Sequence, residues 1–249
     1  MDTAPPAIAV LFDRTWIYVL AALLLVVEAA WPQRPEAGMP QRRWGLHAVL
    51  FACSSALGWL LAGGTAMLGD LFHSGQRSPW VGWWHLALVA LVLDHTSYWL
   101  HRVKHRTPLL WSWHRLHHAD TSLDVSTTVR HHPLDALSSG LVIGLVALAI
   151  GARPVEIAAY GVLAFAVQIA AHANLRFPAG LSWLAAVLVT PALHHLHHAP
   201  HVRDTDSNYG EVLSLWDRMF GTFNPPRGAV TAFGVEPVTA RPDTSRTAE

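Results

Sequence analysis

The sequence predicts an all-α membrane protein: a polytopic bundle of about four to five transmembrane helices with a histidine-rich helical cap on its cytoplasmic side. Three observations support this fold class. The 249-residue chain is 52% hydrophobic and 14% charged, whereas soluble proteins carry about 25% charged residues. Long apolar segments recur along it, and many of its 17 histidines lie in short clusters between or after those segments.

Each apolar segment is expected to form a helix, and a helix needs roughly 20 residues to cross a bilayer. The segments cover approximately residues 16–31, 44–68, 80–100, 134–151 and 155–172. The last two are separated by a short Gly-Ala-Arg-Pro sequence, which is typical of the tight turn in a helical hairpin. A weaker apolar segment, 179–193, is bordered by two prolines and either crosses the membrane or lies along its surface.

Basic residues predict the orientation of these spans. With five spans, residues 32–43, 101–133 and 173–249 share one side of the membrane, and they hold fourteen of the 17 Lys and Arg residues. Loops rich in Lys and Arg stay in the cytoplasm, so this side is expected to be cytoplasmic and the N-terminus to lie outside. The N-terminal sequence Met-Asp-Thr has no basic region, which favours a retained first span over a cleaved signal peptide.

Histidine clusters lie on this predicted cytoplasmic side. Residues 114–118 and 194–198 both read H-x-x-H-H, and His101 and His105 add a pair four residues apart. Positions i, i+3 and i+4 share one face of a helix, and imidazole is the commonest ligand for transition metals. The clusters are interior and spaced, unlike a purification tag, although a histidine-rich surface is an alternative. Eight rings are too many for one ion, so the sequence predicts a metal pair.

Other features exclude several classes of site. The single cysteine, Cys53, lies in an apolar run, which excludes an intramolecular disulfide and a thiolate-ligated zinc or iron–sulfur site. The formal net charge is zero, so no nucleic-acid partner is expected, and no G-x-G-x-x-G motif for a dinucleotide follows a strand. The third helix is expected to continue past the membrane, with Asp94, Tyr98, His101 and His105 along one stripe. Asp94 then either orients a ligand histidine, pairs with an arginine or caps a neighbouring helix.

Several short motifs carry a resemblance to a known family. They are DHTSYWLHRVKH (94–105), WHRLHH (113–118), RHHPLD (130–135), HAN (172–174), PALHHLHH (191–198), and NYG (208–210) followed by LWDRMFGTF (215–223). Together they resemble the fatty acid hydroxylase/sterol desaturase superfamily of integral-membrane di-metal oxygenases. The resemblance covers about residues 94–223. Asp135 stands where the family has Glu, so its shorter side chain would have to reach further.

The resemblance implies a ligand set that adds His132 and His172 to the three clusters. The implied metal ligands are His101, His105, His114, His117, His118, His132, His172, His194, His197 and His198. Four further residues are candidates for orienting those ligands through hydrogen bonds: Asp94, Asn174, Asn208 and Asp217. His131, His195 and His201 fall off the ligand pattern, and His195 is expected to be either a supporting or a solvent-facing residue.

The resemblance also implies an activity: O2-dependent hydroxylation of a C–H bond in a membrane lipid, whether fatty acyl, sterol-like or ether lipid. The cofactors would be two iron ions, since zinc has no redox chemistry, with O2 as co-substrate. Electrons would come from a separate donor, either a ferredoxin with its reductase or a cytochrome b5-like protein. A lipid desaturase using the same site is the alternative. A metal transporter or other metal-binding membrane protein is a more distant alternative. A transporter would place its metal ligands near the middle of the membrane, and the predicted spans hold few ionisable groups.

These expectations divide the chain into three regions. Residues 1–79 would hold the first two transmembrane helices, 80–223 a fatty acid hydroxylase-like catalytic domain, and 224–249 a disordered tail. The protein is expected to be a multi-pass protein of a bacterial inner membrane, with its histidine site and C-terminus in the cytoplasm. Small residues of the later spans would either line a lipid pocket or serve helix packing; they are Ala136, Ser138, Gly140, Gly144 and Ala147.

Overall fold

The computed structural model describes residues 15–34, 43–58 and 83–236, and every named regular element in these ranges is a helix. The longer helices are α2 (Thr15–Ala30), α4 (Trp83–Arg106), α6 (Pro133–Ala149) and α7 (Pro154–His172), and residues 43–58 are also helical. The shorter ones are α5 (Pro108–His118), η1 (Val125–Val129), η2 (Ala179–Ala186), α8 (Pro191–His197), α9 (Val202–Thr205) and α10 (Leu215–Met219). The predicted all-α class is confirmed for the described residues.

Prolines mark where four of these helices begin. Pro108, Pro133, Pro154 and Pro191 each occupy the first helical position, where the missing N–H costs nothing and the fixed φ angle already suits a helix. The hairpin between α6 and α7 turns at Gly151, whose φ of 67° is accessible to glycine without strain. The predicted tight turn is therefore present.

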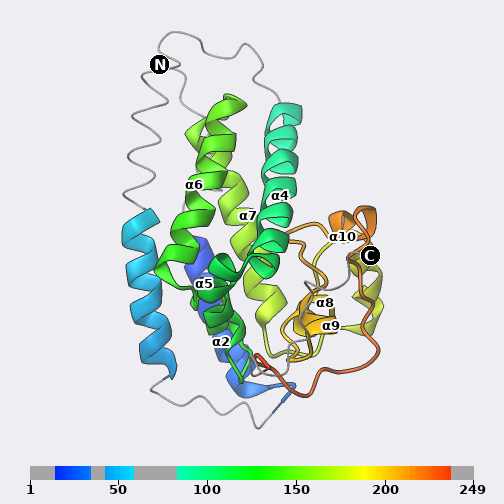
Figure 1. Cartoon of the computed structure of the whole chain (residues 1–249). Coiled ribbons are helices and arrows are strands. Elements are labelled where there is room, and N and C mark those ends of the chain that lie inside the picture. The colour runs from blue at the N-terminus through cyan, green and yellow to red at the C-terminus, as the bar shows by residue number, and fades with distance from the viewer. Residues whose placement is uncertain (1–14, 35–42, 59–82, 237–249) are drawn as a thin grey trace.

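Helices α4, α6 and α7 lie side by side as the centre of the bundle (Figure 1). They bury the main apolar cluster, which consists of Val89, Leu93, Ala147, Tyr160, Ala164 and Val212. Because α6 and α7 are antiparallel, the start of α6 and the end of α7 lie at the same end of the bundle as the end of α4. The connecting segments and α8 pack against this end (Figure 1), so residues far apart in the sequence meet there.

The predicted spans are only partly tested by this architecture. Helix α7 is the one described helix that is long and apolar enough to cross a membrane, whereas α6 and residues Ile17–Ala30 are shorter apolar helices. Helix α4 continues without a break from the predicted third span to Arg106, as expected. Of the second predicted span, residues 59–68 lie outside the described residues. A bundle of four to five spans therefore stays a prediction.

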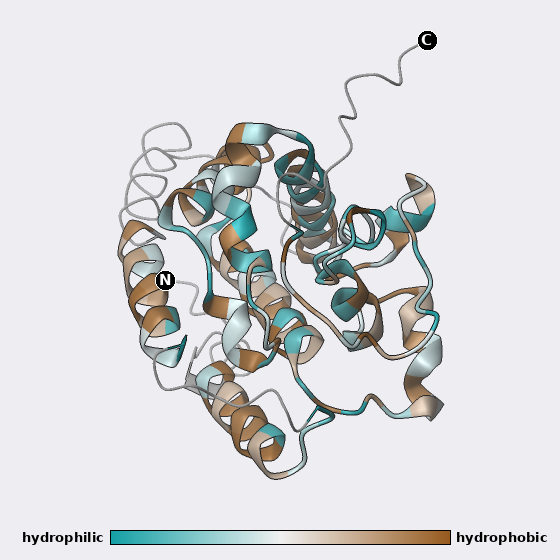
Figure 2. Cartoon of the chain, turned by 60° about the horizontal axis from the view of Figure 1, so that its bottom comes forward, coloured by the Kyte–Doolittle hydropathy of each residue, from teal (hydrophilic) through white to brown (hydrophobic). Residues whose placement is uncertain are grey.

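The outer faces of the long helices carry exposed apolar side chains. Leu23, Val26, Leu141, Leu145 and Leu163 are each about half exposed or more, and the outer helices are coloured mostly hydrophobic in Figure 2. Buried polar residues instead concentrate at the end of the bundle where α4, α5, α7 and α8 meet. The molecule is thus apolar along its sides and polar within one end.

The C-terminal region contains little regular structure. η2 has no buried residue, and its Trp183 is 65% exposed. Residues 224–236 form no helix, but Phe233 is buried beneath the Arg34 guanidinium. The remainder of the expected disordered tail, residues 237–249, lies outside the described residues.

Candidate metal centre

Nine of the ten predicted ligands are buried together at the polar end of the bundle. The last turns of α4 carry His101 and His105, and α7 ends at His172. The faces of the two H-x-x-H-H copies contribute the others, which are His114, His117, His118, His194, His197 and His198. Helical periodicity places the three rings of each copy on one face, and the bundle brings these faces together.

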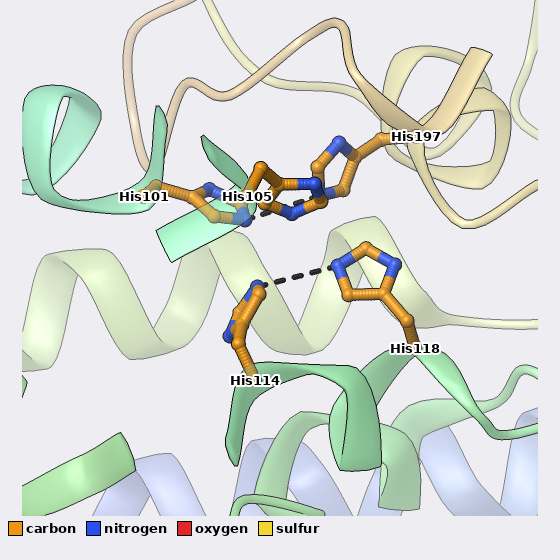
Figure 3. A group of neighbouring side chains, drawn as sticks. All are labelled: His101, His105, His114, His118 and His197. Atoms are coloured by element: carbon orange, nitrogen blue, oxygen red, sulfur yellow. Dashed lines mark hydrogen bonds between the residues drawn. The ribbon is translucent and has the colours of Figure 1, made fainter. Parts of the chain in front are cut away.

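The nine rings form two groups. The first group contains His101, His105, His114, His118 and His197, and the second contains His117, His172, His194 and His198. Within each group the ligand nitrogens all lie within 4.8 Å of one another. Figure 3 shows the rings of the first group turned toward one another, with those of α4 and α8 on one side and those of α5 on the other. Two groups fit the predicted metal pair better than one large site.

Hydrogen bonds in the first group show which nitrogens are free to bind a metal. His101 Nδ1 donates to the Tyr209 carbonyl at 2.9 Å, and His197 Nδ1 donates to the Ser207 carbonyl at 2.7 Å. A carbonyl only accepts, and a neutral imidazole has one N–H, so each Nε2 carries a lone pair. These two Nε2 atoms face each other at 3.1 Å. Two lone pairs at this distance repel unless a cation lies between them.

The distance itself fits one ion bound by both rings. Two imidazole nitrogens, each about 2.1 Å from a shared ion, lie roughly 3.0–3.4 Å apart at tetrahedral to octahedral angles. Burial lowers the pKa of His197 to about 3, so the ring is neutral near pH 7 and able to act as a ligand. The same burial lowers the pKa of His118 well below its usual value.

The second group has the same arrangement. His172 Nδ1 donates to the Gln168 carbonyl at 2.8 Å, which leaves a lone pair on Nε2. That Nε2 lies 3.0 Å from His194 Nε2 and 3.2 Å from His117 Nε2. Both nitrogens of the His198 ring are buried without a hydrogen-bond partner among the described residues. Buried polar atoms are rarely left unsatisfied, and a bound transition metal would satisfy the ring nitrogen that carries the lone pair, so the residues present fit a metal pair.

The supporting carboxylates act differently from the sequence-based expectation. The Asp94 carboxylate accepts from the backbone N–H groups of Val212 and Leu213 and from the indole of Trp216. None of these donors is a histidine, and neither is the Tyr160 hydroxyl that also reaches Asp94 Oδ1 at 3.4 Å, so Asp94 anchors residues 212–216 rather than orienting a ring. The sequence raised three roles for Asp94, and the observed contacts resemble the capping of a neighbouring helix most closely.

Asp217 and Asn208 stabilise the loop that does contact the ligands. Asp217 accepts from the backbone N–H groups of Tyr209 and Gly210. Asn208, with a φ of 54°, donates to the carbonyls of Leu193 and Asn224. This loop supplies the carbonyls of residues 207 and 209 that hold His197 and His101, so the two residues support the ligands indirectly. Asn174 instead exchanges hydrogen bonds with the Arg34 backbone.

Asp135 supports a ligand directly despite its short side chain. Its Oδ2 accepts from His114 Nδ1 at 3.2 Å and from His131 Nδ1 at 3.1 Å. Its Oδ1 pairs with the Lys104 ammonium at 2.7 Å. The shorter side chain, which was expected to have to reach further, makes these contacts because the start of α6 lies close to the end of α4. The signals in the sequence were the spacing from His131 to Asp135 and the placement of the chain's one lysine between His101 and His105.

His132 and His131 both lie differently from what the family pattern implies. His132 lies outside both groups because its Nδ1 accepts from the Leu134 N–H and so caps the start of α6. His131, which the motifs left aside, stacks on His117 with ring centroids 4.3 Å apart. His195 is buried and contacts the Arg34 guanidinium at 3.3 Å, so it does not face solvent, and its supporting role stays a prediction.

A cavity of about 430 Å³ adjoins both groups. Five ligand rings form part of its wall: His101, His114, His117, His172 and His194. Small residues of α6 and α7, including Ala136 and Ala164, also line it. Of the small residues expected either to line a pocket or to serve helix packing, Ala136 lines the cavity and Ala147 packs in the core.

Comparison with known proteins places this arrangement in a family. The model of the fatty acid hydroxylase family matches residues 86–222. Alkylglycerol monooxygenase of Danio rerio is 34% identical over 63% of this chain and 34% of its own length. Ornithine lipid hydroxylase OlsE of Rhizobium tropici is 32% identical over 63% of this chain and 48% of its own.

The human alkylglycerol monooxygenase is 31% identical over 61% of this chain and 33% of its own. The chain therefore matches about a third to a half of the length of these relatives. No solved structure matches it. The family match covers more than half of the chain and contains all nine clustered histidines, so this chain belongs to the fatty acid hydroxylase family.

Proposed function

We propose that this protein is a di-iron enzyme that uses O2 to hydroxylate a C–H bond of a membrane lipid. The observation that carries the proposal is the pair of histidine groups, with Nε2 lone pairs facing one another beside a cavity. The relatives named above are monooxygenases and hydroxylases that act on lipids. Their names support an oxidoreductase, and the cavity beside the rings offers room for a substrate.

The chemistry of the relatives supports iron over zinc. All nine proposed ligands are imidazoles, which suit iron and zinc alike, but zinc lacks the redox chemistry to oxidise an unactivated C–H bond. When bound, the two irons would supply electrons to O2 and the oxidising power for the reaction. Electrons for each turnover would come from a separate protein, a ferredoxin with its reductase or a cytochrome b5-like donor.

The protein's own residues hold and isolate the site. The carbonyls of Ser207, Tyr209 and Gln168 fix which nitrogen of each bonded ring faces the centre, so the ligands need little rearrangement to bind metal. The buried rings and the apolar far wall of the cavity keep water away from the reacting carbon, which limits side reactions.

The proposal places the enzyme in a bacterial inner membrane as a multi-pass protein, with the histidine end and C-terminus cytoplasmic. The exposed apolar side chains of α2 and α6, together with Leu163 of α7, support contact with lipid, because large exposed apolar patches mark membrane or protein interaction sites. η2, with Trp183 and Leu181 exposed and no charged residue, would lie at the interface. A lipid then reaches the cavity from the bilayer and the electron donor reaches it from the cytoplasm.

Metal and product analysis of the full chain tests this proposal. Purified protein in detergent is expected to hold about two irons per chain and, with a ferredoxin, its reductase, NADPH and O2, to add one oxygen atom to a membrane lipid. Loss of two hydrogens instead would identify a desaturase. Stoichiometric zinc in protein that consumes no O2 after iron reconstitution would overturn the proposal.

A further inference from the structure

Charged side chains in the cavity lie at the end next to the metal ligands. Lys104 lies between His101 and His105 on α4, Asp135 is bonded to His114, and Glu211 follows the loop that holds His101. The wall formed further along α6 and α7 is apolar and includes Ile143, Ala164 and Phe165. A lipid in this cavity therefore meets polar groups at one end and hydrocarbon at the other.

Two of the charged groups neutralise each other. The Lys104 ammonium is 2.7 Å from Asp135 Oδ1 and 2.6 Å from the Ser139 hydroxyl. The other Asp135 oxygen accepts from His114 and His131. Both side chains are thus paired within the protein and have little capacity left for a ligand.

Glu211 differs because its carboxyl group has no such partner. No ion pair or hydrogen bond joins that carboxyl group to the residues that the structure describes, although it lines the cavity. Burial, and secondarily the nearby Asp94 carboxylate, raise its pKa to about 7. A poorly solvated acid without a donor is unfavourable, so the position suits a group that gains its donor from a ligand.

The backbone of Glu211 is fixed close to the metal ligands. Gln168 Nε2 donates to the Glu211 carbonyl at 2.6 Å, and the Gln168 carbonyl accepts from His172. On the other side, the N–H of the next residue, Val212, donates to Asp94. The carboxyl group is therefore presented by a segment that hydrogen bonds connect to a ligand of the second group.

We propose that Glu211 binds a hydrogen-bond donor, a hydroxyl or an ammonium, in the headgroup of the lipid substrate. The alkyl tail then runs along Ile143, Ala164 and Phe165. The headgroup lies at the metal end of the cavity, so the carbon that is oxidised is within a few bonds of it and not in the middle of a hydrocarbon chain. This inference rests on the proposed function for its chemistry, but the binding it describes is measurable without turnover.

Matched ligands test the role of the donor. Binding of 1-O-hexadecylglycerol and of its 2,3-di-O-methyl ether to the metal-loaded full chain in detergent is measured by tryptophan fluorescence. A hydrogen bond to a charged acceptor should favour the free diol by about ten- to hundredfold. Glu211→Leu should remove that preference. Glu236→Leu, which changes a carboxylate paired with the exposed His201, should keep it.

A second ligand pair distinguishes the two donor classes. Hexadecylamine is compared with N-acetylhexadecylamine, which has the same chain but no charge. If the natural donor is an ammonium, Glu211→Gln should weaken binding of the amine about tenfold or more while preserving much of the preference for the diol. If the natural donor is a hydroxyl, hexadecylamine should bind with nearly the same affinity as N-acetylhexadecylamine in every variant.

The proposal is overturned if wild-type protein binds each ligand and its blocked form equally. It is also overturned if Glu211→Leu keeps the preference, or if both Glu211 variants lose metal, which would make Glu211 part of the metal site. An enzyme that shows the binding preference but oxidises no lipid would contradict the proposed function and leave the binding role of Glu211 supported.

Discussion

The two histidine groups differ in how firmly their rings are held. In the first group, Nδ1 of four of the five rings has a partner: Tyr209 O for His101, Asp206 for His105, Asp135 for His114 and Ser207 O for His197. In the second group only His172 has one, to the Gln168 carbonyl. Nδ1 of His117, His194 and His198 is buried without a hydrogen-bond partner among the described residues.

This difference indicates unequal metal sites. A ring whose second nitrogen is already bonded has a fixed tautomer and orientation, so it loses less entropy on binding a metal and is the more basic ligand. We therefore expect the first group to bind its ion more tightly, and the second group to exchange its ion more easily. The following predictions test this comparison, from the largest expected effect to the smallest.

Loss of a ligand should have the largest effect. His197→Ala removes a firmly held ligand and is expected to lower bound metal from about two ions per chain to about one and to reduce hydroxylation to background. Elemental analysis and product assays measure the two effects. His117→Ala should likewise lose activity and about one ion; retention of both ions in either variant would remove that ring from the ligand set.

Stepwise chelation should separate the two groups. As chelator is added to wild-type protein, about one ion per chain should leave before the other, because tethered rings typically improve metal affinity about 10- to 100-fold. His198→Ala, in the second group, should retain mainly the tightly held ion. Simultaneous loss of both ions at one chelator concentration would contradict the difference between the groups.

Removing a supporting carboxylate should weaken the first group alone. Asp135→Asn takes away the acceptor for His114 and is expected to lower affinity for the more tightly bound ion by about 10- to 100-fold. The matched control is Glu156→Gln, which alters another buried carboxylate bonded to a histidine, His85, at the opposite end of α7. The control should bind both ions as the wild type does.

The smallest effect is expected at His132. His132→Ala removes a cap from α6 and should lower the free energy of unfolding by about 1 kcal/mol, as measured by chemical denaturation. Metal content should not change, because the ring lies in neither group. If His132→Ala lost one ion per chain, His132 would be a metal ligand, as the family motif implied.

The parts of the site that sequence could predict were those set by local periodicity. The i, i+3, i+4 spacing fixes a common face for three rings whatever the tertiary structure, so the two copies of H-x-x-H-H and the His101–His105 pair were predictable. His172 was brought into the set by the family motif, because one histidine at the end of a helix has no spacing pattern.

The supporting contacts could not be predicted from the residues. Two of the acceptors are backbone carbonyls, at Ser207 and Tyr209, and a carbonyl leaves no mark on the sequence. Asp94 shares a helical stripe with His101, which suggested a direct contact, but its carboxylate faces the C-terminal segment. Helical spacing indicates which residues share a face, whereas partners from distant segments depend on packing.

The anchoring of residues 212–216 by Asp94 has a consequence for the biogenesis of the protein. Helix α4 carries a buried carboxylate, and three of its donors, the Val212 and Leu213 amides and the Trp216 indole, are synthesised more than a hundred residues later. Until that segment leaves the ribosome, Asp94 lacks these three donors, and His101 lacks the Tyr209 carbonyl that orients its ring. The first group therefore reaches its final arrangement late, only after the last segment of the region that the family model matches has folded onto the bundle, and we expect metal capture by it to follow that step.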